Sequence, residues 1–171
     1  MTFIVVMGVA GCGKSAVARK LAAARGLPWI EGDDFHPPAN VHKMREGIPL
    51  GDSDREVWLQ TLCHEIRSHP QGCVLACSAL KSSYRDVFRQ VTPAVRFVYL
   101  HITPKESLRR VAERSGHFYP PSLVLSQFDT LEDPSAEPDV LRVDAMGPMG
   151  SMVDVVQKGL LEVQAGLLKV G

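Results

Sequence analysis

The feature that most constrains this chain is the octapeptide GVAGCGKS at residues 8–15. It fits the pattern G-x-x-x-x-G-K-[ST] in full, and it lies between a short apolar run at residues 3–7 and a stretch of helical period. In that context the pattern wraps backbone N–H groups around phosphate oxygens. Gly8, Gly11 and Gly13 permit the backbone angles and the close approach that such a loop needs. We therefore expect the chain to bind a phosphorylated ligand.

The end of this loop indicates a nucleoside triphosphate held together with a metal ion. Lys14 is expected to reach the β- and γ-phosphates, and the Ser15 hydroxyl is expected to ligate Mg²⁺. The helix that follows adds the positive end of its dipole. The residues expected to contact ATP through the loop, Cys12 by its backbone, are Gly8, Gly11, Cys12, Gly13, Lys14, Ser15 and Ala16.

The rest of the chain lacks the companion motifs of other nucleotide-binding classes. The N-K-x-D motif that reads guanine is absent, which argues against a GTPase. The apolar run CVLAC at residues 73–77 leads into Ser78 rather than into an acidic residue, which argues against an ATP-driven motor. The remaining interpretation is a small-molecule kinase that uses ATP.

Short β-rich runs alternate with stretches of helical period along the chain. Five strands are expected, at residues 3–7, 28–30, 73–77, 95–100 and 140–143. Their continuous apolar character is typical of strands covered on both faces, as in a parallel sheet flanked by helices. The predicted fold is α/β, a doubly wound five-stranded parallel sheet of the P-loop NTPase kind, with the ligand site at the carboxyl ends of the strands.

Length and composition indicate one domain over residues 1–171, since 45% of the residues are hydrophobic and 22% are charged. With 19 basic and 19 acidic residues, the chain lacks the basic excess of a nucleic-acid-binding domain, and we expect no nucleic-acid partner. Trp29 and Trp58 are expected in packing rather than in base stacking. Two stretches interrupt the alternation of strands and helices. The first, at about residues 37–56, is expected to contribute substrate contacts, and the second, at about residues 115–138, is expected to form a mobile lid.

The chain is expected to be cytoplasmic, without a membrane partner. No segment approaches the roughly 20 apolar residues that span a bilayer. The N-terminal MTFIVVMGVAG lacks the basic start of a secretory signal. The four cysteines lack paired C-x-x-C spacing, and Cys73 and Cys77 are expected to face one core as free thiols, which is typical of a reducing compartment.

The stretch EGDDFH at residues 31–36 places three carboxylates and a histidine directly after the second expected strand. If that strand stays extended, Glu31 and Asp33 point to the same side, which can face the phosphate loop. We expect Asp33 to accept the proton of a substrate hydroxyl, and Glu31 to order the water shell of Mg²⁺. His36 either touches substrate or orients the loop. The alternative is that these acids, Asp34 above all, cap the next helix.

Four stretches together resemble the gluconokinase family of P-loop small-metabolite kinases: GVAGCGKS, EGDDFHPPANVHKMREGIPLGDSDREVWL, CSALKSSYRDVFR and ERSGHFYPPSLVLSQFDTLEDP. The resemblance covers about residues 3–144, with one departure at Val57, where the family pattern has proline. It implies ATP-dependent transfer to the 6-hydroxyl of D-gluconate. It also implies a core like that of nucleoside monophosphate kinases and shikimate kinase, a closing lid and a homodimer.

An anionic polyol such as gluconate needs charged and polar partners. Lys81 and Arg85 are four residues apart on an expected helix, hence on one face, and they are expected to pair with a sugar-acid carboxylate. A solvated helix face is the alternative. The expected substrate contacts are Asp33, His36, Lys43, Arg55, Lys81 and Arg85.

Arg110 and Arg114 repeat the spacing of four just before the expected lid. They resemble lid arginines that stabilise charge on a transferring phosphoryl group, and Arg110 is also expected to contact ATP. Surface salt bridging is the alternative. Pro148, after the last strand, is expected to pack on adenine. His117 and Gln127 resemble family lid positions, and the sequence assigns them no chemistry.

Overall fold

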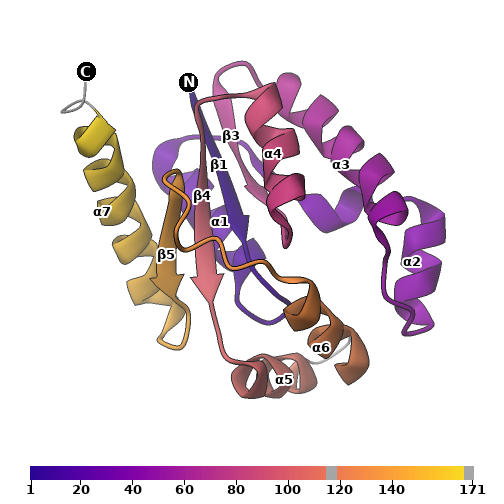
Figure 1. Cartoon of the computed structure of the whole chain (residues 1–171). Helices are drawn as coiled ribbons and strands as arrows, with labels where there is room; N and C mark the ends of the chain where they lie inside the picture. Colours follow the sequence, from indigo (N-terminus) through magenta and orange to yellow (C-terminus); the bar gives the residue numbers. More distant parts are fainter. Residues whose placement is uncertain (115–118, 168–171) are drawn as a thin grey trace.

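The structure is a computed structural model that describes residues 1–114 and 119–167, with side chains described through residue 162. Five parallel strands form one sheet in the order β2-β3-β1-β4-β5 (Figure 1). They are β1 (Thr2–Met7), β2 (Trp29–Glu31), β3 (Gly72–Ala76), β4 (Val95–His101) and β5 (Val140–Asp144). Each strand lies within one residue of its predicted bounds, so the prediction of a five-stranded parallel sheet is confirmed.

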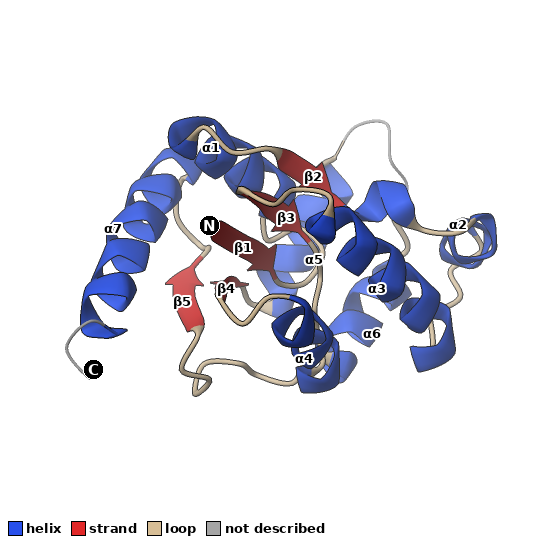
Figure 2. Ribbon diagram, turned by 90° about the horizontal axis from the view of Figure 1, so that it is seen from above, coloured by secondary structure: helices blue, strands red, loops and turns tan. Residues whose placement is uncertain are grey.

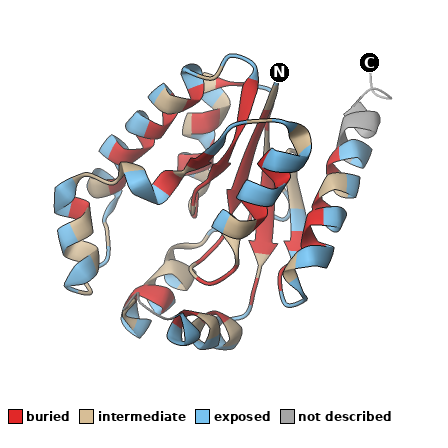
Figure 3. Ribbon diagram, turned by 180° about the vertical axis from the view of Figure 1, so that it is seen from behind, coloured by how far each residue is buried: buried red, intermediate tan, exposed pale blue. Residues whose placement is uncertain are grey.

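Helices cover both faces of this sheet (Figure 2). Helices α1 (Lys14–Arg25) and α7 (Met149–Leu167) pack on one face, and α3 (Asp52–Arg67) and α4 (Ser82–Val91) pack on the other. Strand residues alternate between the two cores. In β1, Val6 faces α1 and α7 while Val5 faces α3 and α4. Figure 3 shows the buried residues gathered in the strands and on the sheet-facing sides of the helices. The doubly wound architecture is thus confirmed.

The remaining helices gather near the carboxyl edge of the sheet. A short 3-10 helix, η1 (Gly32–Phe35), follows β2 and leads into α2 (Pro38–Arg45). Helices α5 (Pro104–Glu113) and α6 (Pro121–Thr130) lie together beyond the carboxyl ends of β1 and β4 (Figure 1). Strands β3 and β2 lie on one side of β1, and β4 and β5 lie on the other. The carboxyl end of β1 is therefore the switch point at which open α/β sheets bind ligands.

The two stretches that interrupt the expected alternation each contain helix. The first, about residues 37–56, contains α2 and the start of α3, and the second, about residues 115–138, contains α6. Residues 115–118, among them His117, lie outside the described part of the chain. Whether the second stretch moves as a lid stays a prediction.

Cys73 and Cys77 both face the core beneath α3 and α4, as expected from their spacing. Burial raises the pKa of each thiol to about 12, so both are protonated at neutral pH. These cysteines therefore serve as small apolar side chains. Over the described residues, no helix combines the length and the apolar character that crossing a membrane requires.

Candidate active site

The phosphate loop, residues 8–15, takes left-handed backbone angles at three glycines. The angle φ is 143° at Gly8, 77° at Gly11 and 97° at Gly13. At Gly8 a Cβ atom would also lie 2.8 Å from the carbonyl oxygen of Leu100. Only glycine meets both demands, so the pattern read from the sequence corresponds to a real backbone requirement. Gly13 directly precedes α1, so the loop ends at a helix N-terminus, the element that attracts phosphate.

The two polar residues at the end of the loop face the acid that ends β2. Lys14 Nζ donates to the carbonyl oxygen of Val9, 3.1 Å away, which folds the ammonium over the loop. Burial raises the pKa of the Glu31 carboxyl group above its usual value of 4.5 and the nearby charge of Asp33 adds to this, while the Ser15 hydroxyl and the Lys14 ammonium both lower it.

Ser15 and Glu31 form a donor set that fits Mg²⁺. Both supply hard oxygen atoms, and Mg²⁺ in phosphate sites keeps several waters and takes only one or two protein ligands. The described residues contain no group of three or more histidine, cysteine, aspartate or glutamate side chains arranged to hold a metal ion. A divalent cation would also favour the ionised form of the buried Glu31 carboxyl.

A cavity of about 160 Å³ lies beside the phosphate loop and brings about half of the expected site residues together. It opens between the loop, η1, the start of α3 and the α5–α6 region. The predicted site residues that line it are Gly11, Gly13, Lys14, Ser15, Asp33, His36, Arg55 and Arg114. Residues from several separate segments thus meet at one place, where a phosphoryl donor and an acceptor can lie side by side.

Asp33 reaches this cavity by a different route from the one expected. Strand β2 ends at Glu31 and η1 begins at Gly32, so the prediction of continued extended alternation is wrong. The tight turn has two causes: Trp58 Nε1 donates to the Gly32 carbonyl oxygen at 2.7 Å, and a Cβ at Gly32 would lie 2.4 Å from the Ala76 oxygen. The Asp33 side chain is 72% exposed, which leaves the carboxylate free to meet a ligand.

His36 lies behind Asp33 as a buried, uncharged ring. Its side chain is 5% exposed, and Nε2 lies 3.8 Å from the Asp33 carboxylate. Burial lowers the pKa of His36 below its usual value of 6.5, Asp33 opposes this, and Arg55 lowers it further. Nδ1 pairs with Asn40 Nδ2 at 3.3 Å. His36 therefore lines the cavity and supports its wall. Contact between His36 and a substrate stays a prediction.

Arg55, in the first turn of α3, is the basic residue best placed to meet an anionic acceptor. It is buried, yet it lines the cavity. One guanidinium nitrogen, Nη1, donates to the Leu50 carbonyl oxygen at 2.8 Å, and the group lies 5.7 Å from the centre of the Tyr84 ring. Its orientation is thus fixed by the protein before any ligand arrives.

Lys43 and Lys81 form ion pairs and are not among the residues that line the cavity. Lys43 Nζ lies 2.8 Å from Asp54, and Lys81 Nζ lies 2.8 Å from Asp52. Lys81 is the residue that caps α4 rather than part of the helix, so the expectation that it shares a helix face with Arg85 is wrong.

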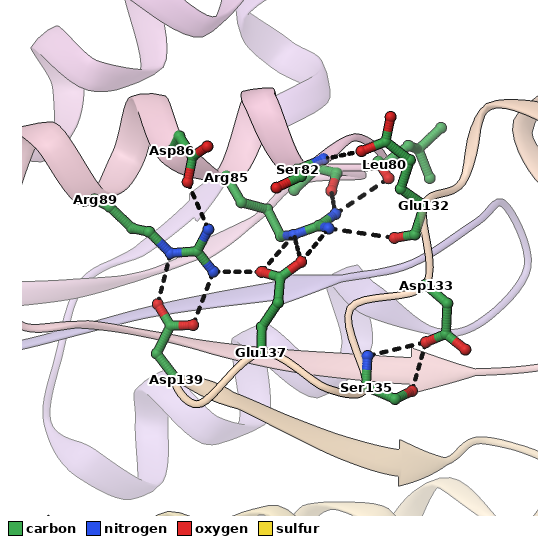
Figure 4. Close-up of polar contacts among 11 residues, drawn as sticks. Leu80, Ser82, Arg85, Asp86, Arg89, Glu132, Asp133, Ser135, Glu137 and Asp139 are labelled. Atoms are coloured by element: carbon green, nitrogen blue, oxygen red, sulfur yellow. Dashed lines mark hydrogen bonds and ion pairs between the residues drawn. The ribbon is translucent and has the colours of Figure 1, made fainter.

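Arg85 is a structural residue rather than a substrate ligand. Figure 4 shows its guanidinium between α4 and the segment that precedes β5. Nε donates to Glu137 at 3.0 Å, Nη1 donates to the carbonyl oxygens of Ala79 and Leu80, and Nη2 donates to that of Glu132 at 3.2 Å. Its side chain is 1% exposed. Because these partners occupy the guanidinium away from the cavity, the expectation of substrate binding by Arg85 is corrected.

A second cavity lies on the other side of the phosphate loop, where Gly11, Gly13, Ser15 and Ala16 meet α5 and α7. Arg110 and Arg114 both line it. Arg110 is held by Glu106, with Nε 2.7 Å from Oε1, and by the Ala145 carbonyl oxygen, 2.7 Å from Nη2. Two arginines therefore border the loop; their action on a transferring phosphoryl group stays a prediction.

Three residues of this second cavity were missed by sequence reasoning. Met149 lines it, whereas Pro148, the residue expected to pack on adenine, does not. Trp29 is 39% exposed and also lines it, which corrects the expectation that it packs in the interior. Arg19 lies 5.7 Å from the centre of the Trp29 ring. The position of Arg19, four residues after Ser15 on α1, was a usable signal, because residues four apart share a helix face.

Known proteins resemble this chain over most of its length. A family model described as an AAA domain matches residues 3–136. A gluconokinase of Gluconobacter oxydans (strain 621H) is 48% identical over 145 residues, which cover 82% of this chain and 81% of that protein. The crystal structure of a gluconokinase from Sinorhizobium meliloti 1021 has a TM-score of 0.92 and 43% identity, covering 99% of this chain and 97% of that one.

A more distant structure supports the fold alone. A shikimate kinase from Acinetobacter baumannii in complex with shikimate has a TM-score of 0.62 at 17% identity, and it covers 97% of this chain and 94% of that one. The predicted likeness of the fold to that of shikimate kinase is thereby confirmed. Given the identity and coverage of its relatives, together with the phosphate loop and the cavity beside it, the chain belongs to the gluconokinase family.

Proposed function

We propose that the protein transfers the γ-phosphate of ATP to the 6-hydroxyl of D-gluconate, giving 6-phospho-D-gluconate and ADP. The observation that carries the proposal is a single cavity in which the Asp33 carboxylate and the Arg55 guanidinium face Lys14 and Ser15 of the phosphate loop. The cavity thus combines a binding site for the phosphate donor, a carboxylate that can accept a proton and a cation that can pair with a sugar-acid carboxylate. The names of the homologous kinases support the choice of gluconate.

On the donor side, the phosphate loop holds the triphosphate. Its backbone N–H groups and the N-terminus of α1 contact the phosphates, and Lys14 leaves the Val9 oxygen to reach the β- and γ-phosphates. The Ser15 hydroxyl would hold Mg²⁺, and the Glu31 carboxylate would support it through water. Bound Mg²⁺ would supply positive charge that offsets part of the charge of the phosphates. Arg110 and Arg114 add positive charge at the edge of the loop.

On the acceptor side, the Asp33 carboxylate takes the proton of the 6-hydroxyl as that oxygen attacks the γ-phosphorus. Arg55 pairs with the carboxylate of gluconate. The neutral His36 ring holds the wall behind Asp33 and adds no charge that would bind the proton acceptor. Lys43 and Lys81 are paired with Asp54 and Asp52. Either lysine could bind the gluconate carboxylate only by leaving its aspartate partner.

The segment of about residues 115–138 acts in this proposal as a lid. It carries Tyr119 and Gln127, which line the cavity. Closure over bound ligands would exclude water, which favours transfer to the sugar acid over transfer to water.

A coupled assay of ADP release tests the proposal. The purified protein is incubated with ATP and Mg²⁺ and a panel of acceptors that includes D-gluconate, other aldonates and shikimate. We expect D-gluconate to give the highest kcat/KM, and ³¹P NMR of the product to place the phosphate on the 6-oxygen. A higher kcat/KM for another acid would contradict the proposed substrate. Nucleotide binding without ADP release for any acceptor would contradict a kinase.

We further propose a cytoplasmic homodimer, as the family resemblance implies. Light scattering on the purified chain measures the mass in solution, and a value near that of one chain of 18.7 kDa would exclude the dimer.

A further inference from the structure

Ala10, at the tip of the phosphate loop, is held through both of its main-chain polar groups by distant side chains. Its N–H donates to Oε1 of Gln127 on α6 at 2.7 Å, and its carbonyl oxygen accepts from Oγ of Ser107 on α5 at 2.6 Å. Ser107 is fully buried. The adjacent Gly11 packs so closely on α5 that a Cβ atom at this position would lie 3.0 Å from the main-chain carbonyl oxygen of Ser107. The tip of the loop is therefore fixed by α5 and α6.

The other end of the Gln127 carboxamide reaches the acceptor side of the cavity. Nε2 donates to the hydroxyl of Tyr119 at 2.9 Å. The orientation of the amide follows from its partners, because only the oxygen can accept from the N–H of Ala10. One side chain thus bridges the donor loop and the segment that covers the acceptor.

Tyr119 is placed to sense the acceptor. It lines the cavity together with Asp33 and Arg55. Burial raises the pKa of Tyr119 to about 12, with the charge of Asp33 adding to this and Arg55 opposing it. The phenol is therefore protonated at neutral pH. Its oxygen accepts from Gln127, and its own hydrogen can be donated to a hydroxyl or carboxylate oxygen of a ligand.

We infer that Gln127 is a positioning residue that couples the nucleotide site to the acceptor site, because one carboxamide binds both the phosphate loop and the tyrosine beside the acceptor. The inference rests on the proposed function, since it takes the cavity beside Asp33 as the acceptor site. A nucleotide that binds the loop in this arrangement favours the position of α6 in which Gln127 orients Tyr119. By linkage, each ligand then tightens the binding of the other by the same factor.

Calorimetric titration of D-gluconate into the whole chain measures this coupling, with and without saturating Mg²⁺ and a non-hydrolysable ATP analogue. For the unmodified protein we expect the analogue to tighten gluconate binding about fivefold or more. Gln127→Met keeps the length of the side chain and removes both hydrogen bonds, and we expect the factor to fall below about twofold. Gln60→Met makes the same chemical change at an exposed position of α3 and should leave the factor unchanged.

Tyr119→Phe separates coupling from a purely structural role. It removes one hydroxyl and keeps the ring, so it also serves if Gln127→Met does not fold. We expect it to lower the factor as Gln127→Met does. The double variant should show no further loss, because both changes interrupt the same connection.

Three results would overturn the inference: an unchanged factor in Gln127→Met, additive losses in the double variant, or no gain in gluconate affinity from the analogue in the unmodified protein. The proposed function is judged separately, by product formation. A protein that makes 6-phospho-D-gluconate without such a gain refutes the coupling alone. A protein that makes no product refutes the proposed function.

Discussion

His36 stacks its imidazole on the indole of Trp58, with ring centroids 4.2 Å apart and planes inclined by 15°. Trp58 in turn donates from Nε1 to the carbonyl oxygen of Gly32. The stack therefore joins α3 to η1, the element that carries Asp33. The wall behind the proposed proton acceptor depends on an aromatic pair in which one partner can be protonated.

Acid should destabilise the protein through His36. Burial lowers its pKa below the usual 6.5, so between the two pKa values the unfolded chain binds more protons than the folded one. The free energy of unfolding should then rise with pH across this window, and fall as pH drops from 6.5 through the lower, folded-state pKa. Urea titrations at about pH 7.5 and about pH 5.5 measure the change.

His36→Phe keeps an aromatic ring against Trp58 and cannot be protonated, so it should show a smaller loss between the two pH values. His64→Phe, at an exposed position on α3, provides the matched control and should behave like the unmodified protein. Equal losses in the unmodified protein and in His36→Phe would remove His36 as the cause.

Asp33→Asn should separate proton transfer from nucleotide binding. The amide has the shape of the carboxylate and cannot take the proton of the 6-hydroxyl, so kcat should fall by about a hundredfold or more. The KM for ATP should stay within about twofold, because the loop that holds the phosphates is untouched. Steady-state assays with each substrate varied in turn give both constants.

Asp34→Asn is the matched control for this change, since Asp34 is exposed and does not line the cavity. It should keep the unmodified kcat. Unmodified turnover in Asp33→Asn would take Asp33 out of the mechanism, and an equal loss in both variants would indicate an effect of local charge.

The sheet and the donor site were predictable from the sequence, because each depends on a local signal. Apolar runs report burial on both faces of a strand, and the glycines of the phosphate loop report backbone angles that other residues rarely adopt. The direction of Asp33 was not predictable in the same way. The turn that carries it depends on a hydrogen bond from Trp58 to Gly32, two residues that are 26 positions apart in the sequence.

The role of Arg85 was also not predictable from the sequence, because its partners are distant along the chain. Its spacing from Lys81 indicated a shared helix face, yet its partners are Glu137, 52 residues away, and the Glu132 carbonyl oxygen, 47 residues away. A cation opposite a substrate and a cation that ties two segments together look alike in a sequence. Only the packing of the segment before β5 on α4 distinguishes them.

Replacement of Arg85 should therefore reduce stability and leave substrate recognition intact. Arg85→Met fills similar space but leaves Glu137 and three carbonyl oxygens short of donors, and the free energy of unfolding should fall by about 3 kcal/mol or more. The KM for D-gluconate, measured at a temperature at which the variant is folded, should not change. A large increase in that KM with unchanged stability would restore Arg85 to the substrate site.

Glu106 should act on ATP through Arg110. Its carboxylate binds Arg109 and Arg110, which lower its pKa to about 2, so it is ionised throughout the range of any neutral assay. Glu106→Gln weakens this charge-assisted hold, and the freed Arg110 should raise the KM for ATP about threefold while leaving that for D-gluconate unchanged. Because a lowered carboxyl pKa stabilises the folded state above the usual 4.5, the unmodified protein should also lose this contribution to stability as pH falls from 4.5 toward 2.

Glu113→Gln is the control for the change in the KM for ATP, because it removes only a partner of Arg109. If both variants change the KM for ATP equally, the effect comes from surface charge and not from the position of Arg110.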